Sequence, residues 1–241
     1  MFARTLGPLT RRALLAHGMR WGSSLHPLGK EFFNRTHDKQ VLLDRFTSKP
    51  ENITVILGGP STGKTALLHE VLSDESKFAV AHMNLRATSF FSWHGLYKET
   101  VQQFHSLIEK LENKDQSILS KLTFGFGKVK VPEPKEVIDF DASLEEIEKS
   151  MPQWGEYRVS KDGKACSLCP VLFIDEANSL DMILQQTDPL VAAENLKALK
   201  SFFDWCVLMT KQTRMHVVFG SSDSFFWHWL ANPESKWCLF V

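Results

Sequence analysis

The chain has 241 residues and equal numbers of basic and acidic side chains, 28 of each, so its formal net charge is zero. With 43% hydrophobic and 23% charged residues, it has the composition of a globular protein, which excludes a disordered or fibrous chain. No apolar stretch reaches the roughly 18–20 residues that cross a bilayer. The four cysteines are too few for a disulfide framework and indicate a reducing compartment.

The first 30 residues differ from the rest in charge. They hold five basic residues and no acid, and apolar residues recur among the arginines at three- or four-residue spacing. This composition is typical of a mitochondrial transit peptide, so it predicts a mitochondrial location; the alternatives are a basic tail without an address and a cytoplasmic protein. Residues 31–241 then carry 23 bases and 28 acids, a net charge of −5, which does not support a nucleic-acid-binding surface.

Short apolar strands alternate with longer helical segments along residues 31–241. The pattern predicts strands at Ile53–Leu57, Phe78–Asn84, Val171–Ile174 and Val217–Gly220. It predicts helices at 63–73, 92–112 and 189–211, and a short one starting at 143. This alternation indicates an α/β fold, a three-layer α/β/α sandwich around a mainly parallel sheet.

The sequence also predicts where one helix begins, which span is an insertion, and which side of the last helix is buried. Ser143 and Glu146 form a capping-box pattern, which is why a helix is expected to begin there. The irregular span 113–168 is expected to be an insertion or a lid. The residues expected on the buried side of helix 189–211 are Leu190, Leu196, Leu199, Phe202, Phe203 and Cys206.

The loop after the first strand matches the phosphate-binding pattern G-x-x-x-x-G-K-[ST] without exception. Its residues are Gly58, Gly59, Pro60, Ser61, Thr62, Gly63, Lys64 and Thr65. Glycines let backbone N–H groups turn toward phosphate oxygens, and the following helix presents its positive N-terminal end. Lys64 is expected to reach the β- and γ-phosphates and Thr65 to ligate Mg²⁺. A strand before the loop and a helix after it are the context that this motif requires, so we expect nucleoside triphosphate binding.

A pair of carboxylates follows the strand at Val171–Ile174. Asp175 suits the Mg²⁺-holding aspartate of a Walker B motif, and Glu176 is placed to activate a water for attack on the γ-phosphate. A GTPase would carry Gly at position 178, where this chain has Asn178, and its N-K-x-D motif is also absent. ATP hydrolysis is therefore the favoured chemistry, with catalytic roles for Lys64 and Glu176.

The strand at Val217–Gly220 ends in Ser221 and Ser222. These hydroxyls are expected to lie near the γ-phosphate if their strand runs between the phosphate-loop strand and the Walker B strand. That is the position of a sensor-1 residue. The alternative interpretation is a turn with capping serines.

Together these motifs resemble the additional-strand P-loop ATPases, and more narrowly the archaeal-type ATPases of the AAA+/STAND group. Residues Phe32–Arg35 resemble that family's opening signature, which packs beside the adenine, so the resemblance implies a nucleotide-binding role for Arg35. The acid that usually follows this Arg is replaced by Thr36. The resemblance covers residues 31 to about 230. It implies ATP and Mg²⁺ as ligands.

The end of the chain departs from that pattern. Residues 236–241 look like the start of a fifth strand, after which such ATPases continue into a helical lid. We therefore expect a core truncated near its fifth strand: either the arginine finger and lid are supplied from elsewhere, or the chain is a truncated product with weak or no turnover. The alternative function is a nucleotide-gated interaction switch with little or no turnover.

Two further groups were considered as sites. Cys166 and Cys169 form a lone CxxC pair, which lacks the other ligands of a structural zinc site and is expected to be two ordinary thiols. The aromatic groups around Phe90–Trp93 and Phe225–Trp229 fit either a core or a surface for a protein partner or self-association.

Overall fold

The computed structural model describes residues 35–86, 92–114, 137–154 and 168–223. Four parallel strands in these ranges form one sheet in the order β1-β4-β3-β2. The strands are β1 (Thr54–Leu57), β2 (Phe78–Asn84), β3 (Cys169–Asp175) and β4 (His216–Ser221). The predicted α/β class with a parallel sheet is confirmed, and so is the place of β4 between the phosphate-loop strand and the Walker B strand.

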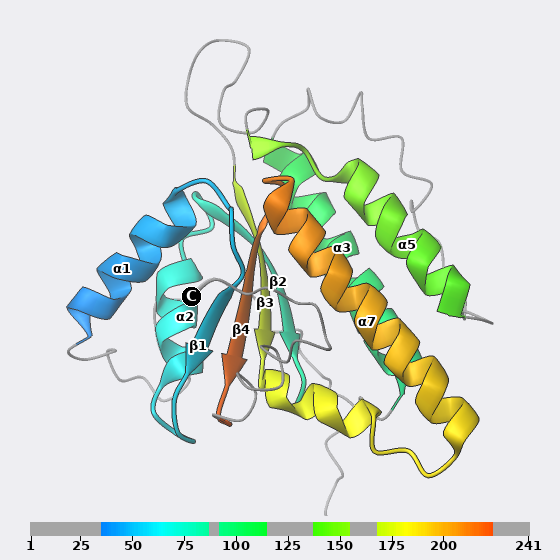
Figure 1. Ribbon diagram of the computed structural model, residues 1–241. Helices are drawn as coiled ribbons and strands as arrows, with labels where there is room; N and C mark the ends of the chain where they lie inside the picture. The colour runs from blue at the N-terminus through cyan, green and yellow to red at the C-terminus, as the bar shows by residue number, and fades with distance from the viewer. Residues whose placement is uncertain (1–34, 87–91, 115–136, 155–167, 224–241) are drawn as a thin grey trace, which may run out of the picture.

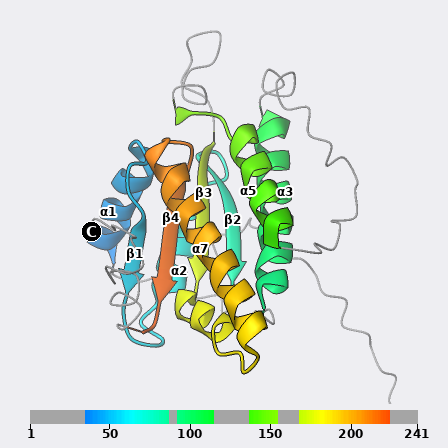
Figure 2. The same ribbon diagram turned by 45° about the vertical axis from the view of Figure 1, so that its right-hand side comes forward.

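Helices cover both faces of the sheet, as Figure 1 shows. On one face lie α1 (Thr36–Thr47) and α2 (Lys64–Leu72). The turned view of Figure 2 shows the other three grouped together on the opposite side: α3 (Trp93–Lys114), α5 (Val137–Ser150) and α7 (Pro189–Lys211). A 3₁₀ helix, η1 (Ala177–Ile183), follows β3. This is the expected three-layer sandwich.

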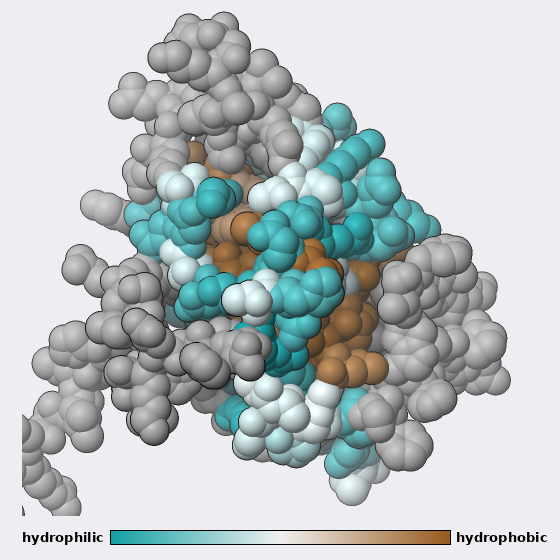
Figure 3. All heavy atoms as spheres, turned by 90° about the vertical axis from the view of Figure 1, so that its left-hand side faces the viewer, coloured by the Kyte–Doolittle hydropathy of each residue, from teal (hydrophilic) through white to brown (hydrophobic). Residues whose placement is uncertain are grey.

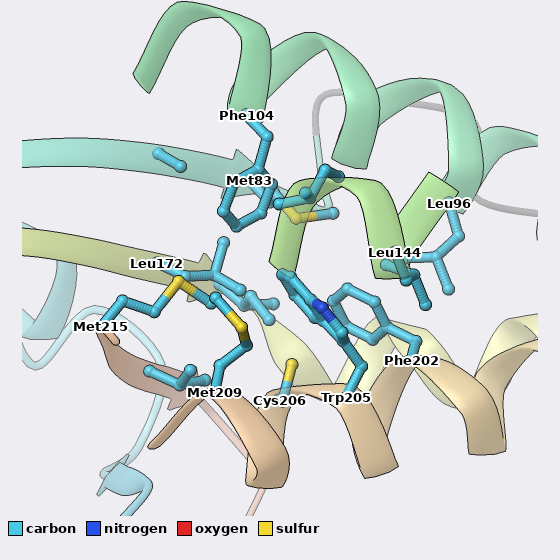
Figure 4. Close-up of a cluster of buried hydrophobic side chains, with 14 of the residues drawn as sticks. Met83, Leu96, Phe104, Leu144, Leu172, Phe202, Trp205, Cys206, Met209 and Met215 are labelled. Atoms are coloured by element: carbon cyan, nitrogen blue, oxygen red, sulfur yellow. The ribbon is translucent and has the colours of Figure 1, made fainter. Parts of the chain in front are cut away.

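Alternate side chains of each strand enter different layers of the molecule. On β3, Leu172 and Ile174 pack beneath α3, α5 and α7, whereas Val171 and Phe173 pack beneath α1 and α2. Figure 4 shows part of the larger core, where Trp205 lies near Phe202 and Phe104. Because β3 is buried on both faces, its sequence is a continuous apolar run rather than an alternating one.

Helix α5 begins earlier than the capping box predicted. It starts at Val137, and the Ser143 hydroxyl donates to the Asp139 carbonyl at 2.9 Å, one turn back inside the helix. The predicted start at 143 is wrong because this local bond satisfies the hydroxyl without ending the helix. Phe140, Leu144 and Ile147 form its buried stripe. The span 113–168 therefore contains a helix of the core, while residues 115–136 and 155–167 lie outside the described ranges.

Helix α7 buries less of its first turns than predicted. Leu190 and Leu196 are 78% and 55% exposed, whereas Leu199, Phe202, Phe203 and Cys206 are buried as expected. Leu190 lies in the first turn of α7, before Asn195, the first buried residue of the helix. Leu196 follows Asn195, which is fully buried, so the helix is already covered at this level and Leu196 is exposed because it lies off the buried face.

None of the helices in the described ranges is both long and apolar enough to cross a bilayer. The side of the molecule with α1 and the β1 edge mixes hydrophilic and apolar surface (Figure 3). Leu57, the last residue of β1, is 41% exposed there. The loop that follows this strand is therefore accessible to solvent.

We expect the stability of the fold to fall when His82 is forced to take up a proton. Its ring stacks on Phe173 with centroids 4.7 Å apart, and His69 lies edge-on at 5.1 Å. Burial, and secondarily the charge of His69, lowers the pKa of His82 from 6.5 to about 4. Between these pH values the unfolded chain binds the proton and the folded chain does not, so stability decreases as the pH falls from 6.5 toward 4.

The loss attributable to His82 is up to about 3 kcal/mol. Urea unfolding at pH 7.5 and pH 4.5 measures it, and His82→Phe, which can keep the stack on Phe173, is the comparison. The variant should lose markedly less stability over that interval than the wild type. Equal losses in the two proteins would contradict this assignment.

Candidate functional site

The phosphate loop joins the end of β1 to the start of α2. Gly63, the residue before α2, has φ 81°, and Ser61 has φ 60°. A left-handed φ of this kind is unstrained only for glycine, which explains Gly63. A Cβ on Gly58 would lie 3.0 Å from the Thr62 hydroxyl oxygen, so a larger residue at this position would require the Thr62 side chain to shift. No side chain caps the first turn of α2. Its backbone N–H groups are therefore available to an anion.

Lys64 folds its side chain back across this loop. Its Nζ donates to the carbonyls of Gly58 at 2.7 Å and Gly59 at 2.9 Å, and the residue is only 7% exposed. Among the ion pairs found in the described ranges, none involves Lys64. A largely buried ammonium bound only to neutral oxygens leaves positive charge that an anionic ligand can compensate.

Thr65 and Asp175 meet at the carboxyl end of the sheet. The Thr65 hydroxyl donates to Asp175 Oδ2 at 2.8 Å, joining residues that are 110 positions apart. Asp175 Oδ1 accepts from the backbone N–H of Glu176 at 3.0 Å. A Cβ on Gly220 of β4 would approach Asp175 Oδ1 to 3.3 Å, so glycine there keeps room for the carboxylate. The two predicted metal ligands therefore form one cluster.

Glu176 is held on both carboxylate oxygens. Its Oε2 accepts from the Ser222 hydroxyl at 2.8 Å, and its Oε1 pairs with the Arg86 guanidinium at 2.7 Å. The backbone of Glu176 is left-handed, with φ 54°, a conformation that costs a non-glycine residue about 1–3 kcal/mol. The left-handed residue stands between the end of β3 and the start of η1, where the chain changes direction.

Asn178 connects the residues after β3 with the residues that end β4. Its Oδ1 accepts from the Ser221 hydroxyl at 3.1 Å and from the Ser222 backbone N–H at 3.3 Å. The Ser221 hydroxyl is buried and also lies 3.1 Å from the Asp223 carbonyl. Of the two serines proposed as sensors, Ser222 is thus the one that contacts Glu176, and Ser221 supports the loop.

Arg35 lies against the phosphate loop from the N-terminal side. Its guanidinium donates to the Thr62 carbonyl at 3.2 Å and pairs with Asp38 at 2.7 Å. Arg35 therefore has an acidic partner three residues further on, at Asp38, rather than at position 36. A second ion pair, Lys39 to Glu70 at 2.7 Å, ties α1 to α2.

Sequence reasoning did not single out Arg86 or the bridging role of Asn178. Asn178 carried a signal, since it lies within the Asp-Glu-Ala-Asn run at 175–178, but its partners are distant in the chain. Arg86 carried none, because only the β2–β3 pairing brings it to Glu176.

Some of the other residues that the sequence singled out lie within the described ranges, and some lie outside them. Trp93 is 2% exposed and belongs to the core, and Cys169 is buried with its thiol donating to the Phe46 carbonyl. Phe32–Asn34, Phe90, Phe91, Cys166 and residues 224–241, with the expected fifth strand, lie outside the described part of the chain.

Comparisons with known proteins agree with the motifs. The family described as an ATPase domain predominantly from Archaea matches residues 32–236. An uncharacterized ATP-binding protein of Methanocaldococcus jannaschii is 28% identical over 204 residues, which are 81% of this chain and 51% of the relative. One of Pyrococcus abyssi is 27% identical over 208 residues, 81% of this chain and 54% of the relative. The chain spans about half the length of these relatives.

A solved structure, the monomer form of the pCW3 conjugation coupling protein TcpA with ATPγS, aligns with a TM-score of 0.32 and 15% identity. It covers 71% of this chain and 43% of that one. The predominance of Archaea among the family's members gives no support to a mitochondrial address, and residues 1–30 lie outside both the family match and the described ranges.

Proposed function

We propose, from the premise that this chain belongs to the family of ATPase domains found predominantly in Archaea, that it binds ATP together with Mg²⁺ and hydrolyses it. The observation that carries the proposal is the contact of Thr65 with Asp175 beside Lys64 and Glu176. Relatives over about four-fifths of the chain are named ATP-binding proteins, which supports the choice of nucleotide.

The donor set fits Mg²⁺. A hydroxyl and a carboxylate are the hard oxygen ligands that this cation prefers. Thr65 Oγ1 and Asp175 Oδ2 lie 2.8 Å apart, so both oxygens could contribute to holding one cation. When bound, the cation would neutralise phosphate charge and fix the orientation of the β- and γ-phosphates.

The remaining chemistry is supplied by residues of this chain. The uncapped N–H groups of α2 and the loop hold phosphate oxygens, and Lys64 exchanges its carbonyl partners for them. Glu176 accepts a proton as a water oxygen bonds to the γ-phosphorus and the bridging P–O bond to the β-phosphate breaks. The products are ADP and inorganic phosphate.

We expect removal of Mg²⁺ to stop turnover, and Thr65→Ala to weaken the cation's effect. With excess EDTA, phosphate release from ATP should fall to background. In Thr65→Ala the Mg²⁺ concentration for half-maximal release should rise by at least roughly 10-fold, the smaller of the losses seen when metal sites lose a supporting group. The measurement is phosphate release against Mg²⁺ concentration at saturating ATP.

Thr47→Ala is the matched control for this experiment. The Thr47 hydroxyl bonds only within the last turn of α1, to the Leu43 and Asp44 carbonyls. It should keep the wild-type Mg²⁺ dependence. An unchanged Mg²⁺ titration in Thr65→Ala would remove Thr65 from the metal site.

A further inference from the structure

We propose that Arg86 is a positioning residue that, with Ser222, orients the Glu176 carboxylate for its work on the attacking water. This inference rests on the proposed hydrolysis. The two groups reach Glu176 from opposite sides: Arg86 follows β2 and Ser222 follows β4, and these are the two strands that flank β3. The Glu176 carboxylate, which follows β3, is thus bound by one residue after each of the two neighbouring strands.

The end of β2 is built to deliver Arg86 to this place. Asn84 pairs in register with Asp175, and the Leu85 N–H donates to the Asp175 carbonyl at 3.2 Å, one residue past the end of the strand. The Asn84 side chain then accepts from the Arg86 N–H at 3.0 Å, which turns the chain. Arg86 therefore leaves the sheet beside the residue that follows Asp175, which is Glu176.

The two side chains of the ion pair, Glu176 and Arg86, differ strongly in their exposure to solvent. The Glu176 side chain is 9% exposed, whereas that of Arg86 is 63% exposed. A carboxylate taken out of water is costly unless a cation or donors compensate it. An exposed guanidinium loses little solvation in return. The ion pair thus fixes the position of the buried Glu176 carboxylate, whereas the Arg86 guanidinium remains largely exposed.

The two contacts leave Glu176 able to act. An ionised carboxylate offers about four lone-pair sites, and the guanidinium and the serine hydroxyl occupy one on each oxygen. Holding both oxygens fixes the plane of the group while sites remain for a water. The backbone of Glu176 is also in the left-handed region. Both the position and the orientation of its carboxylate are therefore constrained.

The test measures ATP turnover and ATP affinity for the wild type and for Arg86→Ala, Arg86→Lys, Glu176→Gln and the double variant Arg86→Ala/Glu176→Gln. We expect Arg86→Ala to lower kcat by roughly 10- to 100-fold, the loss caused by misplacing a catalytic group by about 1 Å. ATP affinity should stay unchanged, and Arg86→Lys should recover part of kcat. In single-turnover assays of Glu176→Gln, adding Arg86→Ala should cause no further loss.

Arg45→Ala is the matched control. Arg45 donates to the Asn52 carbonyl before β1, at the opposite edge of the sheet, and its variant should keep wild-type kcat. Full turnover in Arg86→Ala would overturn the proposal. So would an equal loss in the presence and absence of the Glu176 carboxylate, because Arg86 would then act independently of it.

Failure of the proposed function gives a different result. If the wild type releases no phosphate above the level of Glu176→Gln, hydrolysis is wrong, and urea unfolding of Arg86→Ala, Glu176→Ala and the variant that carries both changes tests the ion pair instead, because alanine, unlike glutamine, removes the contact with Arg86. Shifts of the unfolding midpoint that are not additive would support the pairing of Arg86 with Glu176. Additive shifts would overturn it.

Discussion

Glu176→Gln is expected to lower steady-state phosphate release by roughly 10²- to 10⁴-fold, the usual contribution of a positioned general base. The amide keeps the size of the carboxylate and can still contact Ser222 and Arg86, so the loop should hold its shape. What it removes is the ability to take a proton from the attacking water. ATP affinity should therefore remain close to that of the wild type.

The measurement is phosphate release with saturating Mg²⁺ and ATP, beside equilibrium binding of a fluorescent ATP analogue. Glu145→Gln is the matched control, because Glu145 forms a largely exposed pair with Lys149 at 3.5 Å on α5. It should change neither quantity. Equal phosphate release from wild type and Glu176→Gln would sink the catalytic assignment. Low release with intact binding in both would favour the nucleotide-gated switch.

Lys64→Ala is expected to lower ATP affinity by about 10²- to 10⁴-fold. The ammonium can offer the phosphates two charge-assisted hydrogen bonds, worth roughly 1.5–3 kcal/mol each, and each 1.4 kcal/mol changes affinity about tenfold. The effect should be large because Lys64 is only 7% exposed and its ammonium lies within the phosphate loop, bound to the Gly58 and Gly59 carbonyls. Equilibrium binding of the fluorescent analogue measures it directly.

A lower ATP affinity of Lys64→Ala could come from the lost charge or from a destabilised fold, and the two have to be distinguished. Removing Lys64 also takes a donor from the Gly58 and Gly59 carbonyls, although the Gly59 carbonyl keeps the Thr62 hydroxyl at 2.9 Å, so thermal unfolding of the variant without nucleotide should accompany the binding assay. Lys77→Ala serves as the control, since Lys77 forms an exposed pair with Asp74 at 2.9 Å. Wild-type affinity in a folded Lys64→Ala protein would undo the phosphate-loop assignment.

Much of the fold could be predicted from local patterns. The four strands were found because each is a short apolar run bounded by turn residues, and all four are observed in a parallel sheet. Helix ends were less accessible. The start of α5 was missed because Ser143 can bond within a helix as well as cap one. The exposure of Leu190 and Leu196 was missed because an apolar spacing does not show at which turn the burial of α7 begins, nor that its buried face is centred on Asn195 and Phe202 rather than on Leu196.

Some residues of the candidate site could likewise be predicted from local sequence patterns, and others could not. The sequence by itself determined the phosphate loop, Thr65, Asp175 and Glu176, since each lies in a contiguous motif whose residue types follow from phosphate and metal chemistry. Only the tertiary structure decided that Arg86 and Asn178 belong with them.

The physical reason lies in the sheet. Parallel strands bring residues from distant positions to one edge, and the order and register that do so depend on packing across the whole molecule. A balanced charge of 28 bases and 28 acids could not show that one of those bases, Arg86, lies 2.7 Å from the acid expected to activate water.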